Sequence, residues 1–268
     1  MNAKRVFAYS LRHLFLYKRS LPRLMEVFYW PLLDLLLWGF VGLYLSGYGA
    51  GGAGLLPDFV AFFLGALILW DILFRSQQGI SVSFLEDVWS RNLINVFVSP
   101  LSPLEYIASL LAISVVKLLL ASSIMTLLAF LLYSFSIFTL GFMLIPLVLN
   151  LIVMGWAIGI VTTALIMRFG QEAEVLAWGV AFLFQPVSAV FYPVSVLPSP
   201  LREIAFLTPS AHVFEGMREV LSGSGSFPAV HIIWAISLNA AYISAAALFF
   251  SWNLKSVRRK GLIAKAGE

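Results

Sequence analysis

Residues 138–167 read FTLGFMLIPLVLNLIVMGWAIGIVTTALIM, without a single Asp, Glu, Lys or Arg. At about 1.5 Å per residue, a helix of this length exceeds the apolar core of a bilayer, which is about 30 Å thick. Pro146 and Asn150 lie inside the run, so we expect the helix to tilt or kink there. This stretch predicts a membrane-spanning helix.

The composition extends that prediction to the whole chain. Of its 268 residues, 61% are hydrophobic and 11% are charged, whereas soluble domains are about half apolar and a quarter charged. We therefore expect an all-α polytopic membrane protein with six transmembrane helices. The first apolar run is too long for the core of a signal peptide, and the second has a polar inner third. The six runs are 27–45, 59–80, 106–133, 138–167, 175–196 and 230–250.

The distribution of Lys and Arg predicts the orientation. Fourteen of these residues flank one side of the six runs, and the other side has only Arg202 and Arg218. By the positive-inside rule, both termini face the cytoplasm of a bacterial-type inner membrane. The cations flank apolar runs instead of forming a patch, so no nucleic-acid partner is expected. This divides the chain into a basic segment (1–25), a six-span domain (26–254) and a basic tail (255–268).

Residues 3–20 have the pattern of an amphipathic helix on the inner membrane surface. Arg5, Arg12 and Arg19 recur every seven residues, and Phe7 and Leu11 belong to an apolar side. The alternative is a frayed basic tail.

The cytoplasmic segment 83–105 contains two helix-start signals. Ser83 with Glu86 forms a capping-box pattern, which predicts a short helix that ends before Pro100. Ser102 and Glu105 form a second capping box at the start of the third run. The short helix is either a rigid docking element or a plain interfacial loop.

The outer segment 197–229 is expected to form two short helices between the fifth and sixth runs. Its first half is semi-apolar, and residues 211–221 follow Pro209 and end near Gly223. So much apolar surface favours a helical hairpin over an open loop.

Several kinds of chemistry lack their residues in this sequence. No G-x-x-x-x-G-K-[ST] motif occurs, so the chain cannot cradle ATP in the usual way. Cysteine is absent, and the three histidines, His13, His212 and His231, are scattered, so neither a metal site nor a hydrolase site is predicted. We expect no catalytic residues and no cofactor on this chain.

Four ionisable residues fall in one layer of the predicted membrane core. Each would be costly alone, so we expect them to pair with one another or to face water. A structural ionic network is the simpler interpretation, and a role in substrate or proton passage is the alternative. The four residues are Asp34, Asp71, Arg75 and Lys117.

The outer segment carries a recognisable signature. Leu197–Pro198, ten residues, Pro209, two residues, His212, five residues and Arg218 resemble the motif of the type-2 ATP-binding-cassette (ABC) transporter permease family. The six runs, the basic N-terminal helix and the short cytoplasmic helix resemble the same family. Ser210 departs from the pattern, which usually has threonine or an apolar residue there.

The resemblance implies a permease subunit that dimerises and pairs with two copies of a separate ATPase, which would bind ATP and Mg²⁺. It implies a coupling helix seated in a cleft of that ATPase and formed by Glu86, Asp87, Trp89, Arg91 and Leu93. A lesser cytoplasmic contact would involve Gln171 and Glu172, and an outer gate would contain Pro209, His212, Glu215 and Arg218.

The assembly that this resemblance implies is an ATP-driven exporter. Two copies of the permease, as a homodimer in the lipid bilayer, would form the path for an amphipathic, lipid or glycan-type substrate. ATP hydrolysis would take place on the ATPase partner, so this chain itself is not expected to be an enzyme.

Two other classes of protein remain as alternatives at this point. A secondary transporter would need an inverted repeat and broken helices. The sequence shows no such symmetry, although Gln185–Pro186 and Pro193 interrupt the fifth run. A channel subunit would need no ATPase partner, so the presence of that partner distinguishes it from the permease.

Overall fold

The structure, a computed structural model, describes residues 1–48, 57–222 and 228–261, and this part of the chain is helical without a strand. The all-α prediction is confirmed. The long helices are α2 (Leu21–Tyr48), α3 (Pro57–Trp89), α5 (Pro103–Tyr133), α6 (Leu144–Phe169) and α10 (Ala229–Arg259). The shorter elements are α1 (Ala3–Lys18), α4 (Leu93–Val98), η1 (Ile137–Met143), η2 (Gly170–Ala173), α7 (Val175–Phe184), η3 (Val194–Val196), α8 (Ser199–Phe206) and α9 (Pro209–Leu221).

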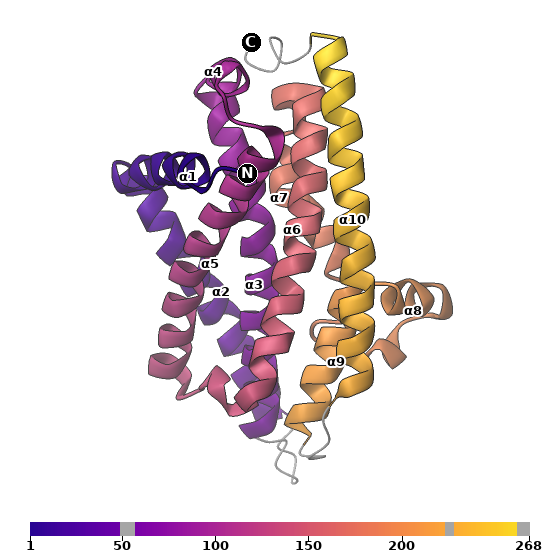
Figure 1. Ribbon diagram of the computed structural model, residues 1–268. Helices are drawn as coiled ribbons and strands as arrows, with labels where there is room; N and C mark the ends of the chain where they lie inside the picture. The colour runs from indigo at the N-terminus through magenta and orange to yellow at the C-terminus, as the bar shows by residue number, and fades with distance from the viewer. Residues whose placement is uncertain (49–56, 223–227, 262–268) are drawn as a thin grey trace.

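The centre of the bundle is the contact of α3 with α6. Helix α6 packs between α3 and α10, and α5 packs on α3 (Figure 1). Gly155 and Gly159 allow the close approach of α6, because a Cβ at Gly155 would lie 2.6 Å from the Leu73 carbonyl oxygen and one at Gly159 would lie 3.0 Å from that of Gln77. Small residues at helix interfaces bring backbones together in this way in membrane proteins.

Among the described residues, three helical segments are long and apolar enough to cross a bilayer: Pro103–Tyr133, Ile137–Ala173 and Ala229–Arg259. Shorter apolar helices cover Phe28–Tyr44 and Val175–Phe184. Helix α3 is long, but its C-terminal half carries buried polar side chains, among them Gln77 and Ser81. The chain therefore has helices suited to a membrane.

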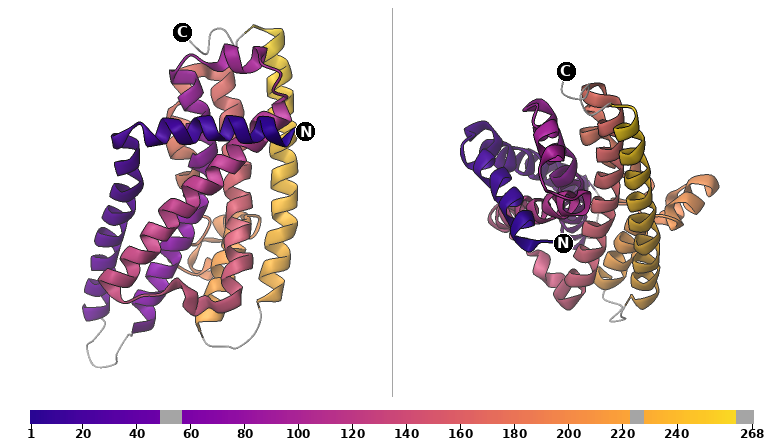
Figure 2. Two further views of the ribbon diagram at one scale, coloured as in Figure 1. Left: turned by 60° about the vertical axis from the view of Figure 1, so that its left-hand side comes forward. Right: turned by 45° about the horizontal axis from the view of Figure 1, so that its top comes forward.

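The two ends of the described chain lie at the same end of the bundle. Helix α1 lies across the long helices in this part of the bundle, and α10 extends past it to the end of the bundle (Figures 1 and 2). Helix α4 is also at this end, whereas α9 and η1 are at the other. The amphipathic helix predicted for residues 3–20 is thus present, and Phe7 and Phe15 on it are exposed.

The fifth and fourth apolar runs differ from their predicted forms. Helix α7 ends at Phe184 and not at residue 196, since Pro186 lacks the N–H that a continuing helix needs. Ten helical residues span only about 15 Å. Pro146 produces no mid-helix kink, because α6 begins at Leu144 and a proline in the first turn is tolerated.

Candidate functional site

The corner between α3 and α4 replaces the predicted helix of residues 83–97. Ser83 is not a helix cap: its hydroxyl donates to the Gly79 carbonyl (2.7 Å) inside α3, which continues to Trp89. The chain then turns at Arg91, which has a φ of 52°, and α4 begins at Leu93. The second capping box is confirmed, because Ser102 and Glu105 bond reciprocally at the start of α5.

The residues of this corner differ in exposure. Trp89 is 41% exposed and Arg91 is exposed, whereas Leu93 is buried against the core. The Trp89 indole Nε1 donates to Glu174 Oε2 at 3.1 Å. Gln171 and Glu172, in η2, are exposed beside this bond. The two segments predicted as cytoplasmic contacts are thus joined by a hydrogen bond.

Glu86 and Asp87 lie behind this corner and are buried, because both carboxylates face α1 and α5. Asp87 accepts hydrogen bonds from Arg12 Nη1 (2.6 Å), the Tyr9 hydroxyl (2.5 Å) and the Tyr106 hydroxyl (3.1 Å). Glu86 Oε2 lies 3.1 Å from His13 Nδ1. Burial, and then the Asp87 carboxylate, raise the pKa of Tyr9 far above its ordinary value.

Lys117 joins the same cluster and not the pair in the centre of α3. Its Nζ lies 2.9 Å from the Ser83 hydroxyl, 3.8 Å from Glu86 Oε1 and 4.1 Å from the centre of the Tyr17 ring. Two carboxylates therefore face two basic side chains, Arg12 and Lys117, with His13 between the carboxylates. We call these residues, with Tyr9 and Tyr106, the α1 cluster.

The other three ionisable residues of the predicted layer lie further along α3 and on α2. Arg75 Nε donates to Asp71 Oδ1 at 3.0 Å, which is the i, i+4 pair expected from the sequence. Asp34 and Arg75 line one cavity. The four charges thus belong to two places instead of one network.

The outer segment is held by Arg218. Its guanidinium donates to the carbonyl oxygens of Ala189, Val190 (3.2 Å) and Tyr192 (2.6 Å), and it pairs with Glu215 at 3.1 Å. Glu215 in turn accepts a hydrogen bond from the Val194 backbone N–H at 2.6 Å. Arg218 and Glu215 therefore fasten the turns that follow α7.

His212 connects three elements from the first turn of α9, which opens at Pro209. Its Nε2 lies 3.0 Å from the Phe206 carbonyl oxygen, and its Nδ1 lies 3.3 Å from His231 Nδ1. Burial lowers the pKa of His212, the hydrogen bond to Phe206 opposes this shift, and His231 acts in the same direction as burial.

Sequence reasoning missed the partners of the buried carboxylates. His13 was seen only as a scattered histidine, although it follows Arg12 and lies at a position where α1 faces the bundle. It also missed a polar clamp in which Asn239 Nδ2 donates to the backbone and side-chain oxygens of Asn150, both at 2.9 Å. Only the presence of Asn in an apolar run signalled this clamp.

Within the described residues, no group of three His, Asp or Glu side chains could hold a metal ion. No protein-family model and no curated protein matches this chain.

Proposed function

We propose that this chain is the transmembrane subunit of an ATP-driven exporter of the type-2 ABC permease kind. Six membrane crossings would place both termini in the cytoplasm of a bacterial-type inner membrane. The chain would act as a homodimer with two separate ATPase subunits, and ATP and Mg²⁺ would bind to those partners. The substrate would be an amphipathic, lipid or glycan-type molecule.

The observation that carries the proposal is the bond between Trp89 and Glu174. This 3.1 Å bond ties the α3–α4 corner to η2, so Trp89, Arg91, Gln171 and Glu172 would form one exposed surface. An indole and an arginine at the centre of such a surface are typical anchors of a protein interface. The surface lies at the same end of the bundle as the basic helix α1 (Figure 1).

The buried residues of the corner suggest a mechanical role. Glu86 and Asp87 would not contact the ATPase directly, as they are bonded to α1 and α5. They would instead hold the corner rigid, so that a push on Trp89 moves α3 and α1 together. Because α3 is continuous to Asp71 and Arg75, that movement would reach the membrane-embedded part of the chain.

The outer segment would complete the path. The hydrogen bonds of Arg218 and Glu215 hold the turns after α7 against α9, which would close the exit in the resting state. ATP-driven closure of the ATPase pair would shift the dimer toward an outward-open state by favouring that conformation.

The test is to tag the chain, purify it from native membranes in mild detergent and assay for an associated soluble ATPase. We expect stoichiometric recovery with vanadate-sensitive hydrolysis. The double variant Trp89→Ala/Arg91→Ala should lose the ATPase, whereas Phe142→Ala, which removes an even more exposed aromatic ring at the opposite end, should retain it. Recovery of the chain alone from several detergents would overturn the proposal and favour a secondary transporter or a channel subunit.

A further inference from the structure

A cavity of about 420 Å³ opens between α2, α3 and α7. Its volume is within the range of sites for drug-sized ligands, about 300–1,000 Å³. Trp30 and Phe182, each 50% exposed, lie at its mouth. The lining includes Trp30, Asp34, Phe74, Arg75, Trp178 and Phe182.

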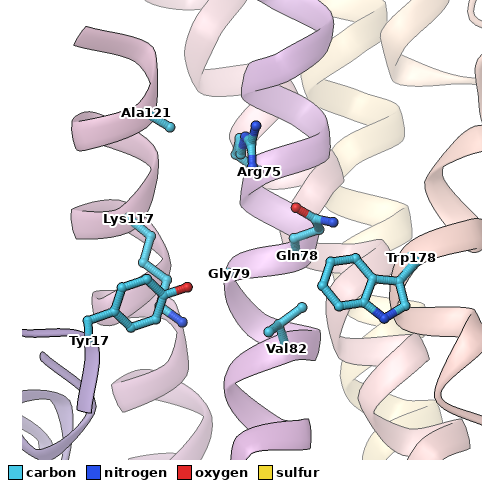
Figure 3. A pocket seen from close by; sticks show the side chains of 8 residues that line it. All are labelled: Tyr17, Arg75, Gln78, Gly79, Val82, Lys117, Ala121 and Trp178. Carbon is cyan, nitrogen blue, oxygen red and sulfur yellow. The ribbon is translucent and has the colours of Figure 1, made fainter. Parts of the chain in front are cut away.

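The inner end of this cavity meets a second, smaller one. Arg75, Gln78 and Trp178 line both, and the smaller cavity continues to Lys117 and Tyr17. Figure 3 shows Arg75 and Gln78 on α3 between Trp178 on one side and the Lys117–Tyr17 pair on the other. A ligand in the larger cavity would therefore meet aromatic rings on its walls and polar groups at its inner end.

The charges around the cavity do not cancel. Arg75 is paired with Asp71 at 3.0 Å, and Lys117 lies 3.8 Å from Glu86. Asp34 also lines the cavity and is attracted electrostatically to Arg75, but Arg75 is already bonded to Asp71, so two carboxylates share one cation. Two carboxylates that share one cation at membrane depth leave a costly net negative charge, and a bound cation would lower that cost.

We propose that this cavity binds a lipophilic monocation, with Asp34 as the counter-ion. The faces of Trp30 and Trp178 would attract the cation, since indole is the strongest aromatic partner for positive charge. Phe74 and Phe182, whose ring centroids are 5.0 Å apart, would pack on the apolar groups of the ligand. As a statement about the transported substrate, this inference rests on the proposed function.

Two probes of the same shape and opposite charge test this proposal. Saturable binding of tetraphenylphosphonium and tetraphenylborate is measured on the full chain in lipid nanodiscs, after subtraction of binding to empty nanodiscs. We expect the wild type to prefer the cation. Asp34→Asn should weaken cation binding about tenfold, because it removes the opposing unit charge. Asp34→Glu keeps the charge and should keep most of the affinity.

The comparison of the two probes on the wild type needs no variant to fold. Equal binding of both ions, preference for the anion, or no cation binding would each overturn the proposal, as would an unchanged affinity in Asp34→Asn. The assay contains no ATPase, so its failure leaves the copurification result standing. Conversely, cation binding without a copurified ATPase would support the proposed cation site and contradict the proposed exporter function.

Discussion

The imidazole Nδ1 of His13 lies 3.1 Å from Glu86 Oε2, although 73 residues separate the two in the sequence. Both side chains are buried, and His13 Nε2 is also 3.7 Å from Asp87 Oδ2. The contact fixes α1 across the end of α3, beside the corner that presents Trp89. A helix that looks like a surface anchor in the sequence is thus part of the rigid base of that corner.

Asp87→Ala should destabilise the protein by about 3–5 kcal/mol, the usual cost of removing one member of a buried ion pair. Arg12, Tyr9 and Tyr106 would all lose their shared acceptor. Thermal unfolding in detergent measures the change. Glu172→Ala, an exposed carboxylate at the same end, should stay within about 0.5 kcal/mol of wild type. Equal changes in the unfolding temperature of both variants would contradict the stabilising role of the α1 cluster.

Gly155→Ala should weaken the α3–α6 contact by about 1–3 kcal/mol, because its Cβ would lie 2.6 Å from the Leu73 carbonyl oxygen. The matched control is Gly179→Ala in α7, where a Cβ meets nothing within 4 Å. That change should be neutral or stabilising, since alanine is the better helix former. Unfolding midpoints of the two variants, compared in one detergent, decide between these expectations.

The clamp between Asn150 and Asn239 should show pairwise coupling. Asn239→Leu removes both donated hydrogen bonds to Asn150 and should cost about 1 kcal/mol, as such bonds do in membrane proteins. The double variant with Asn150→Leu should cost less than the sum of the two single changes. Strict additivity in the double-mutant cycle would mean that the two side chains act independently.

His212 should make the outer segment less stable in acid. Burial lowers the pKa of His212 in the folded state. As the pH falls below the pKa of the unfolded state, the unfolded chain therefore binds more protons than the folded protein. The free energy of unfolding decreases over that pH range. Protonation of His212 would also place a hydrogen on its Nδ1, which lies 3.3 Å from His231 Nδ1. Hydrogen exchange of α9 at pH 7.5 and pH 5 measures the effect. His231→Leu should reduce this pH dependence, and an unchanged dependence would count against the pair.

Sequence patterns predicted local structure correctly where the interacting residues are only three or four positions apart. The capping box of Ser102 and Glu105 and the pair of Asp71 with Arg75 involve residues three and four apart, so helix geometry alone brings them together. Ser83 and Glu86 have the same spacing as a capping box, but α3 continues through them. A serine inside a helix can bond to the carbonyl four residues earlier, and Ser83 does so.

The sequence by itself determined the apolar runs, the helical class, the amphipathic N-terminal helix and the asymmetry of Lys and Arg, because these follow from composition and short-range spacing. The tertiary structure decided that Glu86 and Asp87 face inward, that Lys117 joins them and not Asp71, and that Asp34 lines a cavity. These outcomes depend on how each helix is rotated about its axis and on which helices become neighbours. Both are set by packing between residues far apart in the chain, such as Gly155 against Leu73.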